Sequence, residues 1–502
     1  MLGFFMVLGY PREFLLVLLL WGQAFFFLLI VFYWLIVPIF DFRFSVSYST
    51  ITMLGLARDG ILVCAILVLL LKIFCVLIIL LGDCKFHSPF PFEQFLPQFV
   101  TICKLVITKK NAIFYLIILI SYSIIGGFIL IEQSDEQSWY YYCGCFMTLE
   151  CIEFWLIFTD SFFIVCVGHL LYCAVLIVVI LIVWWRNNWK EIHPFSWLGF
   201  LFGVVLIAIS VWSFYTITGE FSWSISKGFQ LIDTDIDMKK MQDDFYLGIL
   251  LPGGFFPVCG LAFSNCKSFP INLRIFFNIT YPIHNFIMLV HSRIIFGDMG
   301  FNYTFFIGLC LTIGVLTICI YFETKFMRIL SLSINVHWYF LLLIYVLAST
   351  ALRDGLVCDI WIHVLCILGH IFLLARYTRC YGEDITTAHK GLFYKYPLAV
   401  LLNITCWAFS ERGMCRFLYQ VYLDFHWTSE DRIFFIILLL LASCIVLYWV
   451  ILLWRWGCLW FQLPKEQDIH NPRKIDAGDV LLLIYLVTLF LLSFYYPLIF
   501  YW

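Results

Sequence analysis

Ionisable side chains recur inside the apolar runs of this chain, where they could carry protons. They are Lys72, Asp160, His284, His337, His363 and Asp424. A charge in hydrocarbon costs about 2–4 kcal/mol or more, so each such residue is a functional candidate. Because they recur in run after run, they are typical of a proton path across linked helices, whereas a transporter more often concentrates such groups at one midplane site. A neutral, hydrogen-bonded structural role stays open for any single histidine.

The composition predicts the solvent in which these groups lie. Of the 502 residues, 64% are apolar and 12% are charged, and the mean hydropathy is +0.99. A soluble domain is about half apolar and a quarter charged. We therefore expect an all-α polytopic membrane protein, and continuous apolar runs favour helices over the alternating strands of a barrel. We treat 1–502 as a single transmembrane domain, with an antiporter-like core at about 112–425 and flanking helices at 1–111 and 426–502.

Runs of roughly 20 apolar residues indicate about fourteen membrane spans. We place them at 12–40, 59–82, 112–132, 140–165, 166–186, 195–218, 246–263, 273–293, 302–322, 329–350, 357–375, 393–409 with a continuation to about 425, 433–456 and 479–500. Polar connectors are expected at 83–111, 220–245 and 461–478. Two helices should be interrupted, one by Pro252, Gly253 and Pro257 and the other near Gly413, because proline removes a backbone hydrogen bond and glycine adds freedom.

Several function classes are excluded or disfavoured by what the sequence lacks. The net charge of −2 argues against nucleic-acid binding, which needs a basic face. The 20 cysteines include no CxxC pair, so no metal or iron–sulfur site is predicted. No glycine-rich phosphate turn is present to hold a nucleotide. We therefore expect no cofactor and no redox site in this chain.

A polar segment between two apolar runs carries a recognisable pattern. Tyr377, Arg379 and Asp384 follow a Tyr-x-Arg-x(4)-Asp spacing, and Gly391 and Pro397 follow after a short gap. This pattern resembles the loop of the subunit 4 family of proton-pumping NADH:ubiquinone oxidoreductase (respiratory complex I), an antiporter-like membrane subunit. The resemblance is best from about Thr324 to Asp424. Subunits 5 and 2 of the same enzyme are the nearest alternatives.

Other residues match the family's motifs in part. Arg328 is followed nine residues later by His337, and His363 precedes Gly369 as in the family. The resemblance implies that His284 stands where the family has a lysine, while the family's other lysine has no counterpart near Pro252.

The resemblance also implies two carboxylates. Asp424 would take the place of one family glutamate. Asp160 would take the place of the other, with Glu150 and Glu153 as rival positions.

The resemblance implies a role as well as a fold. The chain would translocate protons in the mitochondrial inner membrane, as an organelle-encoded subunit driven by electron transfer elsewhere in complex I. NADH, flavin, iron–sulfur clusters and ubiquinone would be bound by other subunits. Partners would be other membrane subunits, including antiporter-like chains, and lipids such as cardiolipin. A free-standing cation/proton antiporter or secondary transporter, and a structural subunit that has lost pumping, stay open as alternatives.

Overall fold

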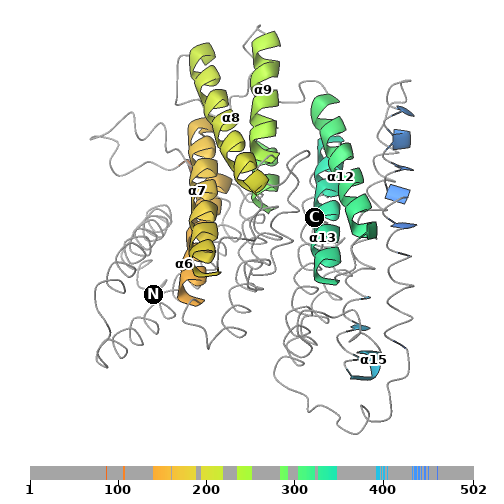
Figure 1. Cartoon of the computed structure of the whole chain (residues 1–502). Helices are drawn as coiled ribbons and strands as arrows, with labels where there is room; N and C mark the ends of the chain where they lie inside the picture. Colours follow the sequence, from red (N-terminus) through yellow and green to blue (C-terminus); the bar gives the residue numbers. More distant parts are fainter. Residues whose placement is uncertain are drawn as a thin grey trace, which may run out of the picture. The chain divides into compact units, whose positions relative to one another are not determined.

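The computed structural model describes seven long stretches of the chain. These are 139–159, 161–187, 194–218, 235–250, 283–291, 303–322 and 326–347, with short pieces at 86–87 and 106–107 and scattered positions between 392 and 461. Nearly all of these residues are helical (Figure 1). The chain divides into two compact units, each described here by itself. The first holds Met1–Glu191, Trp197–Pro252 and Ile283–Gly300, and the second holds Ile192–Ser196, Gly253–Pro282 and Phe301–Trp502.

Helices α6 (Trp139–Phe158) and α7 (Phe162–Asn187) pack against each other in the first unit. The break between them is short. The amide of Thr159 still bonds to the carbonyl of Trp155, and α7 then starts with the amide of Val165 bonded to the carbonyl of Ser161. The side chain of Thr159 accepts a hydrogen bond from the amide of Ser161 at 3.2 Å, which satisfies one amide that would otherwise be unpaired at the helix start.

A glycine sets how closely α6 and α7 approach. A Cβ atom at Gly168 would lie 2.6 Å from Cδ2 of Leu156, and Leu156 is fully buried. Packed interiors leave no room for an added methyl group at that distance. Gly168 therefore permits the close contact that brings the inner face of α7 against α6.

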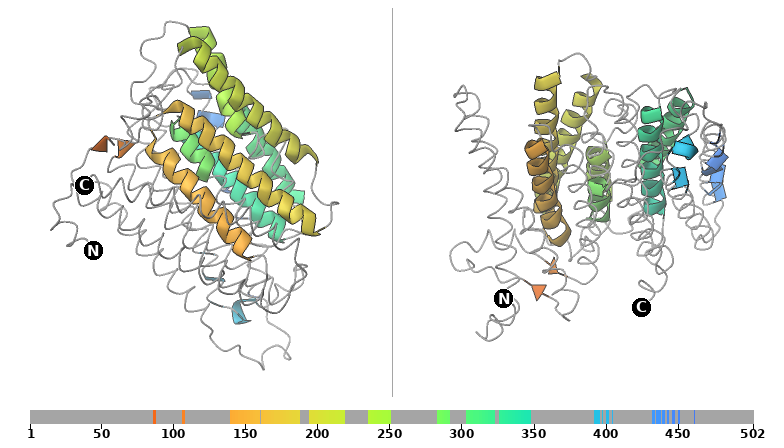
Figure 2. Two further views of the ribbon diagram at one scale, coloured as in Figure 1. Left: turned by 90° about the vertical axis from the view of Figure 1, so that its left-hand side faces the viewer. Right: turned by 90° about the horizontal axis from the view of Figure 1, so that it is seen from below.

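Helices α8 (Pro194–Thr218) and α9 (Asp235–Leu250) complete the helical layer of this unit. Figures 1 and 2 show the two running alongside each other. A Cβ atom at Gly248 of α9 would lie 2.8 Å from Cγ1 of Ile207 in α8. The rings of Phe162, Phe214 and Phe245 meet in one cluster, with centroid separations of 4.6 Å and 5.6 Å from Phe162, so α7, α8 and α9 share an aromatic core.

The helical segment 283–291 is the most enclosed part of the first unit. Eight of its nine side chains are buried, including both of its histidines, His284 and His291. A helix that is buried on every side belongs in the middle of a larger assembly. The segment therefore brings its polar side chains into the interior rather than to a surface.

Helices α12 (Tyr303–Phe322) and α13 (Phe326–Leu347) pack together in the second unit. One face of α12 buries Leu309, Ile313, Leu316 and Ile320. The opposite face leaves large apolar side chains exposed, among them Ile307, Leu311, Ile318, Tyr321 and Phe322. A contiguous exposed apolar face of this kind is typical of a surface that meets lipid or another protein.

Within the described part of the chain, no helix combines the length and the apolar character needed to cross a membrane. The count of about fourteen spans, and the single-domain interpretation, stay predictions.

The predicted helix positions agree closely with the structure in several places and differ in others. The predicted span 195–218 corresponds to α8, 302–322 to α12 and 329–350 to α13. The predicted junction at 165/166 is wrong, because α6 ends at Phe158 and α7 begins at Phe162. The break falls on Thr159, Asp160 and Ser161, and the prediction overlooked these three polar residues because long apolar runs stand on both sides of them.

Two connectors also contain regular structure. The predicted connector 220–245 is corrected in its second half, where α9 begins at Asp235. Its charged first turns hid a helix whose inner face carries Met241, Phe245 and Ile249 at helical spacing. The connector 83–111 contains a small antiparallel pair, β1 (Phe86–His87) and β2 (Val106–Ile107). In the second unit, α15 (Leu392–Lys395) is a short helix between Gly391 and Pro397 of the predicted loop motif.

Candidate functional site

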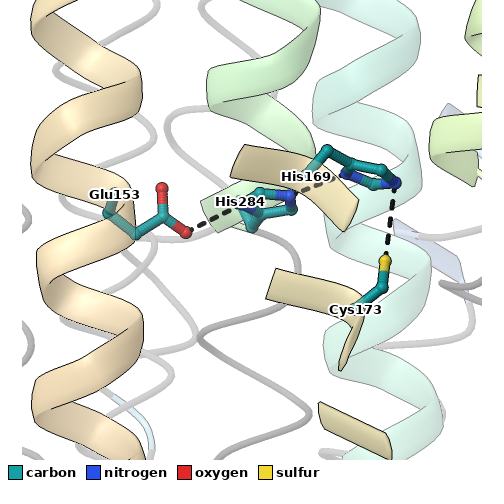
Figure 3. Close-up of polar contacts among 4 residues, drawn as sticks. All are labelled: Glu153, His169, Cys173 and His284. Atoms are coloured by element: carbon teal, nitrogen blue, oxygen red, sulfur yellow. Dashed lines mark hydrogen bonds and ion pairs between the residues drawn. The ribbon is translucent and has the colours of Figure 1, made fainter. Parts of the chain in front are cut away.

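Three elements of the first unit bring polar side chains together in its interior. Glu153 comes from α6, His169 and Cys173 come from α7, and His284 comes from the segment 283–291. The side chains of Glu153, His169 and His284 are 0% exposed. Figure 3 shows His284 lying between Glu153 on one side and His169 on the other.

Contacts run in series through these four residues. Nδ1 of His284 lies 3.0 Å from Oε1 of Glu153. Nε2 of the same ring lies 2.8 Å from Nδ1 of His169, and Nε2 of His169 lies 3.5 Å from Sγ of Cys173. Each histidine therefore uses both ring nitrogens, and each contact joins groups that can exchange a proton. We name Glu153, His284, His169 and Cys173 the polar relay.

The helical spacing of α7 explains how His169 and Cys173 reach the interior. Their face of the helix buries Phe162, Val165, Cys166, Tyr172 and Leu176 at intervals of three and four residues. His169 stands in the middle of this face, and Cys173 lies one turn beyond it. On α6, Glu153 shares its face with Leu149 and Ile157, which are also buried. Apolar packing thus brings the polar groups inward.

An aromatic ring holds the central histidine. Tyr172 stacks on His284 with ring centroids 3.7 Å apart and planes within 5°. The ring of His169 lies 5.0 Å from that of His284, with the planes 17° apart. Because His284 is bonded through both nitrogens and covered by Tyr172, its ring plane is set by its neighbours. The relay is therefore preorganised, which a proton path needs.

One oxygen of the relay points to a continuation of it. Oε2 of Glu153 is buried and makes no hydrogen bond within the part of the chain that the structure describes. Burying a carboxylate oxygen without a donor costs free energy, about 1–3 kcal/mol or more for a charged group. Such a cost is typical of a group with a functional role. No set of three or more metal-ligating side chains converges among the described residues.

Of the six in-membrane residues predicted from sequence, two lie in described parts of the chain. His284 is the centre of the relay. His337 is buried on α13 in the second unit. The other four, Lys72, Asp160, His363 and Asp424, lie outside the described residues. The common polar axis through His284, His337 and His363 stays a prediction.

The helix breaks and most of the loop motif also lie outside the described residues. This holds for Pro252, Gly253, Pro257, Gly413, Tyr377, Arg379, Asp384 and Gly391. Pro397 is described, and it is helical and exposed. The two predicted helix interruptions therefore stay predictions.

Sequence reasoning missed His169 and gave Glu153 only as a rival to Asp160. His169 carried the same signal as the histidines that were found, namely an ionisable residue in the middle of a long apolar run. Glu153 could not be ranked above Glu150 or Asp160, because its partner His284 is 131 positions away. The contact that distinguishes these acids exists only in the folded chain.

Similarity to known proteins is found in structure and not in sequence. No family model matches the sequence, and no curated protein matches it. Solved structures do match. One is a chain from the structure of the membrane-bound sulfane sulfur reductase, an archaeal respiratory membrane complex, with a TM-score of 0.70 and 12% identity. The match covers 97% of this chain and 95% of the other.

A second similar structure is a chain of respiratory complex I from Thermus thermophilus with bound NADH. The TM-score is 0.65 and the identity is 13%, over 86% of this chain and 91% of the other. Both neighbours come from multi-subunit respiratory membrane complexes. At such low identity the likeness shows the fold alone. This chain therefore has a fold found in chains of respiratory membrane complexes, the complex I family among them.

Proposed function

We propose that this chain is a proton-translocating, antiporter-like membrane subunit of a respiratory oxidoreductase complex, and that protons pass through Glu153 and His284. The observation that carries the proposal is the contact between the two side chains. It is 3.0 Å long, fully buried, and made between elements far apart in the sequence. The apolar composition of the whole chain and the fold shared with chains of respiratory membrane complexes agree with this role.

The chemistry of the pair suits proton transfer. A carboxyl group and an imidazole at hydrogen-bond distance share one proton between two forms, carboxylate with imidazolium or carboxylic acid with imidazole. Neither form needs a large movement, because both groups are already in contact. A buried charge is costly unless it is paired, so the charge on Glu153 depends on His284 and on what lies beyond it. A coupled process elsewhere in the complex that changes the charge on Glu153 could therefore move the proton between Glu153 and His284.

In its finer form, the proposal is that the chain is subunit 4 of complex I in the mitochondrial inner membrane, encoded in the organelle. The loop spacing of Tyr377, Arg379 and Asp384 and the register of Arg328 and His337 support this form. Electron carriers would then be bound by other subunits, and this chain would meet other antiporter-like chains and cardiolipin. Purification of an NADH-oxidising complex that contains this chain supports the finer form. Recovery of the chain alone, active as a cation/proton exchanger in vesicles, would overturn it.

The experiment that tests the pumping role compares two acids on the same helix. Glu153→Gln keeps the shape and removes the titratable group, and Glu150→Gln makes the same change one turn earlier on α6. In the assembled complex in sealed vesicles, substrate oxidation and proton uptake are measured together. We expect Glu153→Gln to lower protons moved per electron pair, while Glu150→Gln retains most of that ratio. Unchanged pumping in an assembled Glu153→Gln complex would remove this proposal.

A further inference from the structure

The polar relay does not end at His284. Its Nε2 lies 2.8 Å from Nδ1 of His169, and both rings are fully buried. Two imidazoles in direct contact share one hydrogen between the facing nitrogens, and the pair can take up only one additional proton without placing two positive charges side by side. The contact is therefore either a hydrogen bond between two neutral rings or one between a protonated ring and a neutral ring. Both arrangements are steps of proton transfer.

We propose that His169 is a proton carrier that exchanges directly with His284, and that Cys173 is the positioning residue that sets the tautomer of His169. This inference rests on the proposed function and names α7 as part of the path. It follows from three contacts in series, at 3.0 Å, 2.8 Å and 3.5 Å, which join α6, the segment 283–291 and α7.

The thiol gives the relay a direction. When the Cys173 S–H donates to Nε2 of His169, the hydrogen of that ring is on Nδ1. Nδ1–H then donates to Nε2 of His284, whose own hydrogen is on Nδ1 and is donated to the carboxylate of Glu153. Every contact in this arrangement has one donor and one acceptor. It is ready to move a proton from α7 toward α6.

A proton that arrives at Nε2 of His169 moves by three linked steps. It bonds to Nε2, while the proton on Nδ1 of His169 passes to Nε2 of His284. The proton on Nδ1 of His284 then passes to Oε1 of Glu153. One proton has entered at α7 and one carboxylate has been neutralised at α6, so charge and atoms balance. The S–H of Cys173 turns away about its Cβ–Sγ bond, and the sulfur then accepts from Nε2–H.

The starting arrangement returns only when the hydrogens of both rings are again on Nδ1, either by the reverse of these transfers or by a turn of both rings. The ring of His284 is bonded at both nitrogens and stacked on Tyr172 at 3.7 Å, so turning it over would break several contacts at once. The thiol turns about a single bond. Cys173 is thus the part of the relay that can exchange donor for acceptor at low cost, and it controls which tautomer His169 holds.

The test uses the whole complex in sealed vesicles and measures protons moved per electron pair. His169→Gln keeps a hydrogen-bonding side chain but cannot pass a proton through itself. We expect its pumping rate to fall about a hundredfold, at the low end of what a positioned proton-transfer group contributes. His169→Asn is the second variant, used if the first fails to assemble. Pumping at the wild-type rate in an assembled variant overturns the inference.

Cys173 is tested against a matched cysteine. Cys166 lies on the same buried face of α7 and is also a free thiol, but it is not part of the relay. Cys173→Ala should slow pumping several-fold, and Cys173→Ser, which restores a rotatable donor, should recover most of the rate. Cys166→Ala should pump like the wild type. Equal effects of Cys173→Ala and Cys166→Ala, or no recovery by serine, would contradict the assigned role.

The two levels of the proposal fail separately. Loss of pumping in Glu153→Gln together with normal pumping in His169→Gln leaves the proposed function standing and removes His169 from the path. Normal pumping in both removes the function and the inference together.

Discussion

Helices α7 and α12 are both long and apolar, but their polar side chains have different hydrogen-bond partners. On α7, His169 and Cys173 lie on the buried face, where His169 also bonds to another element. On α12, Thr312 and Thr317 bond to the carbonyls of Gly308 and Ile313 in their own helix, each at 2.8 Å.

The difference shows why a polar residue in an apolar helix is not by itself a site. A threonine hydroxyl can satisfy itself against the carbonyl four residues earlier. The imidazole of His169 has two ring nitrogens, of which one contacts Cys173 on its own helix and the other contacts His284 on another element. The relay residues therefore tie elements of the first unit together, whereas Thr312 and Thr317 are satisfied locally. Variants of both helices and of the relay test this distinction.

The largest effect is expected from breaking the centre of the relay. His284→Leu leaves the buried carboxyl group of Glu153 without its imidazole, and removal of one partner of a buried pair costs about 3–5 kcal/mol. We expect the free energy of unfolding in detergent to fall by that amount, or the complex to assemble poorly. Adding Glu153→Leu to His284→Leu should restore part of the loss, since the carboxyl group is then gone and only Nδ1 of His169 still lacks its partner in the relay. A double variant that is less stable than His284→Leu would contradict this account.

The next effect concerns the close approach of α6 and α7. Gly168→Ala places a methyl group against Leu156 at 2.6 Å, and such overpacking costs about 1–3 kcal/mol. Gly314→Ala on α12 is the matched control, because nothing lies within 4 Å of its added Cβ. Gly168→Ala should therefore unfold at a lower temperature than Gly314→Ala. Similar unfolding temperatures would mean that the interface of α6 and α7 can shift to make room.

A smaller effect is expected from the ring that covers His284. Tyr172→Phe keeps the stacked ring, whereas Tyr172→Leu removes it, and an aromatic pair contributes about 0.5–1.5 kcal/mol beyond its buried area. We expect Tyr172→Leu to lower stability and the ratio of protons to electrons more than Tyr172→Phe does. The ratio separates a positioning role from simple packing. Equal ratios in the two variants would show that stacking does not matter for transfer.

The smallest effect is expected on α12. Thr317→Val removes a hydroxyl that bonds within its own helix at 2.8 Å, and a substitution away from any special contact stays within about 0.5 kcal/mol. Pumping and unfolding temperature should match the wild type. A clear loss of pumping would show that α12 also takes part in the path, and it would remove the contrast with α7.

The sequence by itself determined the helical character of the described chain and the position of several helices. Long apolar runs predict 195–218 and 302–322 to within a residue of α8 and α12, because the length and end of such a run depend on local residues. The same local reasoning found His284 as an ionisable residue among apolar ones. It also ended one helix too late, at 165 instead of Phe158, since apolar residues resume directly after the three polar residues 159–161.

Only the tertiary structure decided which groups meet. Glu150, Glu153 and Asp160 lie within about ten positions of one another in the sequence, and nothing in their local sequence distinguishes them. Glu153 is the one that contacts His284, 131 positions away, and His284 in turn contacts His169 at a separation of 115. Such pairs form because apolar faces of α6, α7 and the segment 283–291 pack together, with Gly168 permitting the close approach. Burial then brings the polar groups into contact with each other, which is a property of the packed chain and of no single stretch of it.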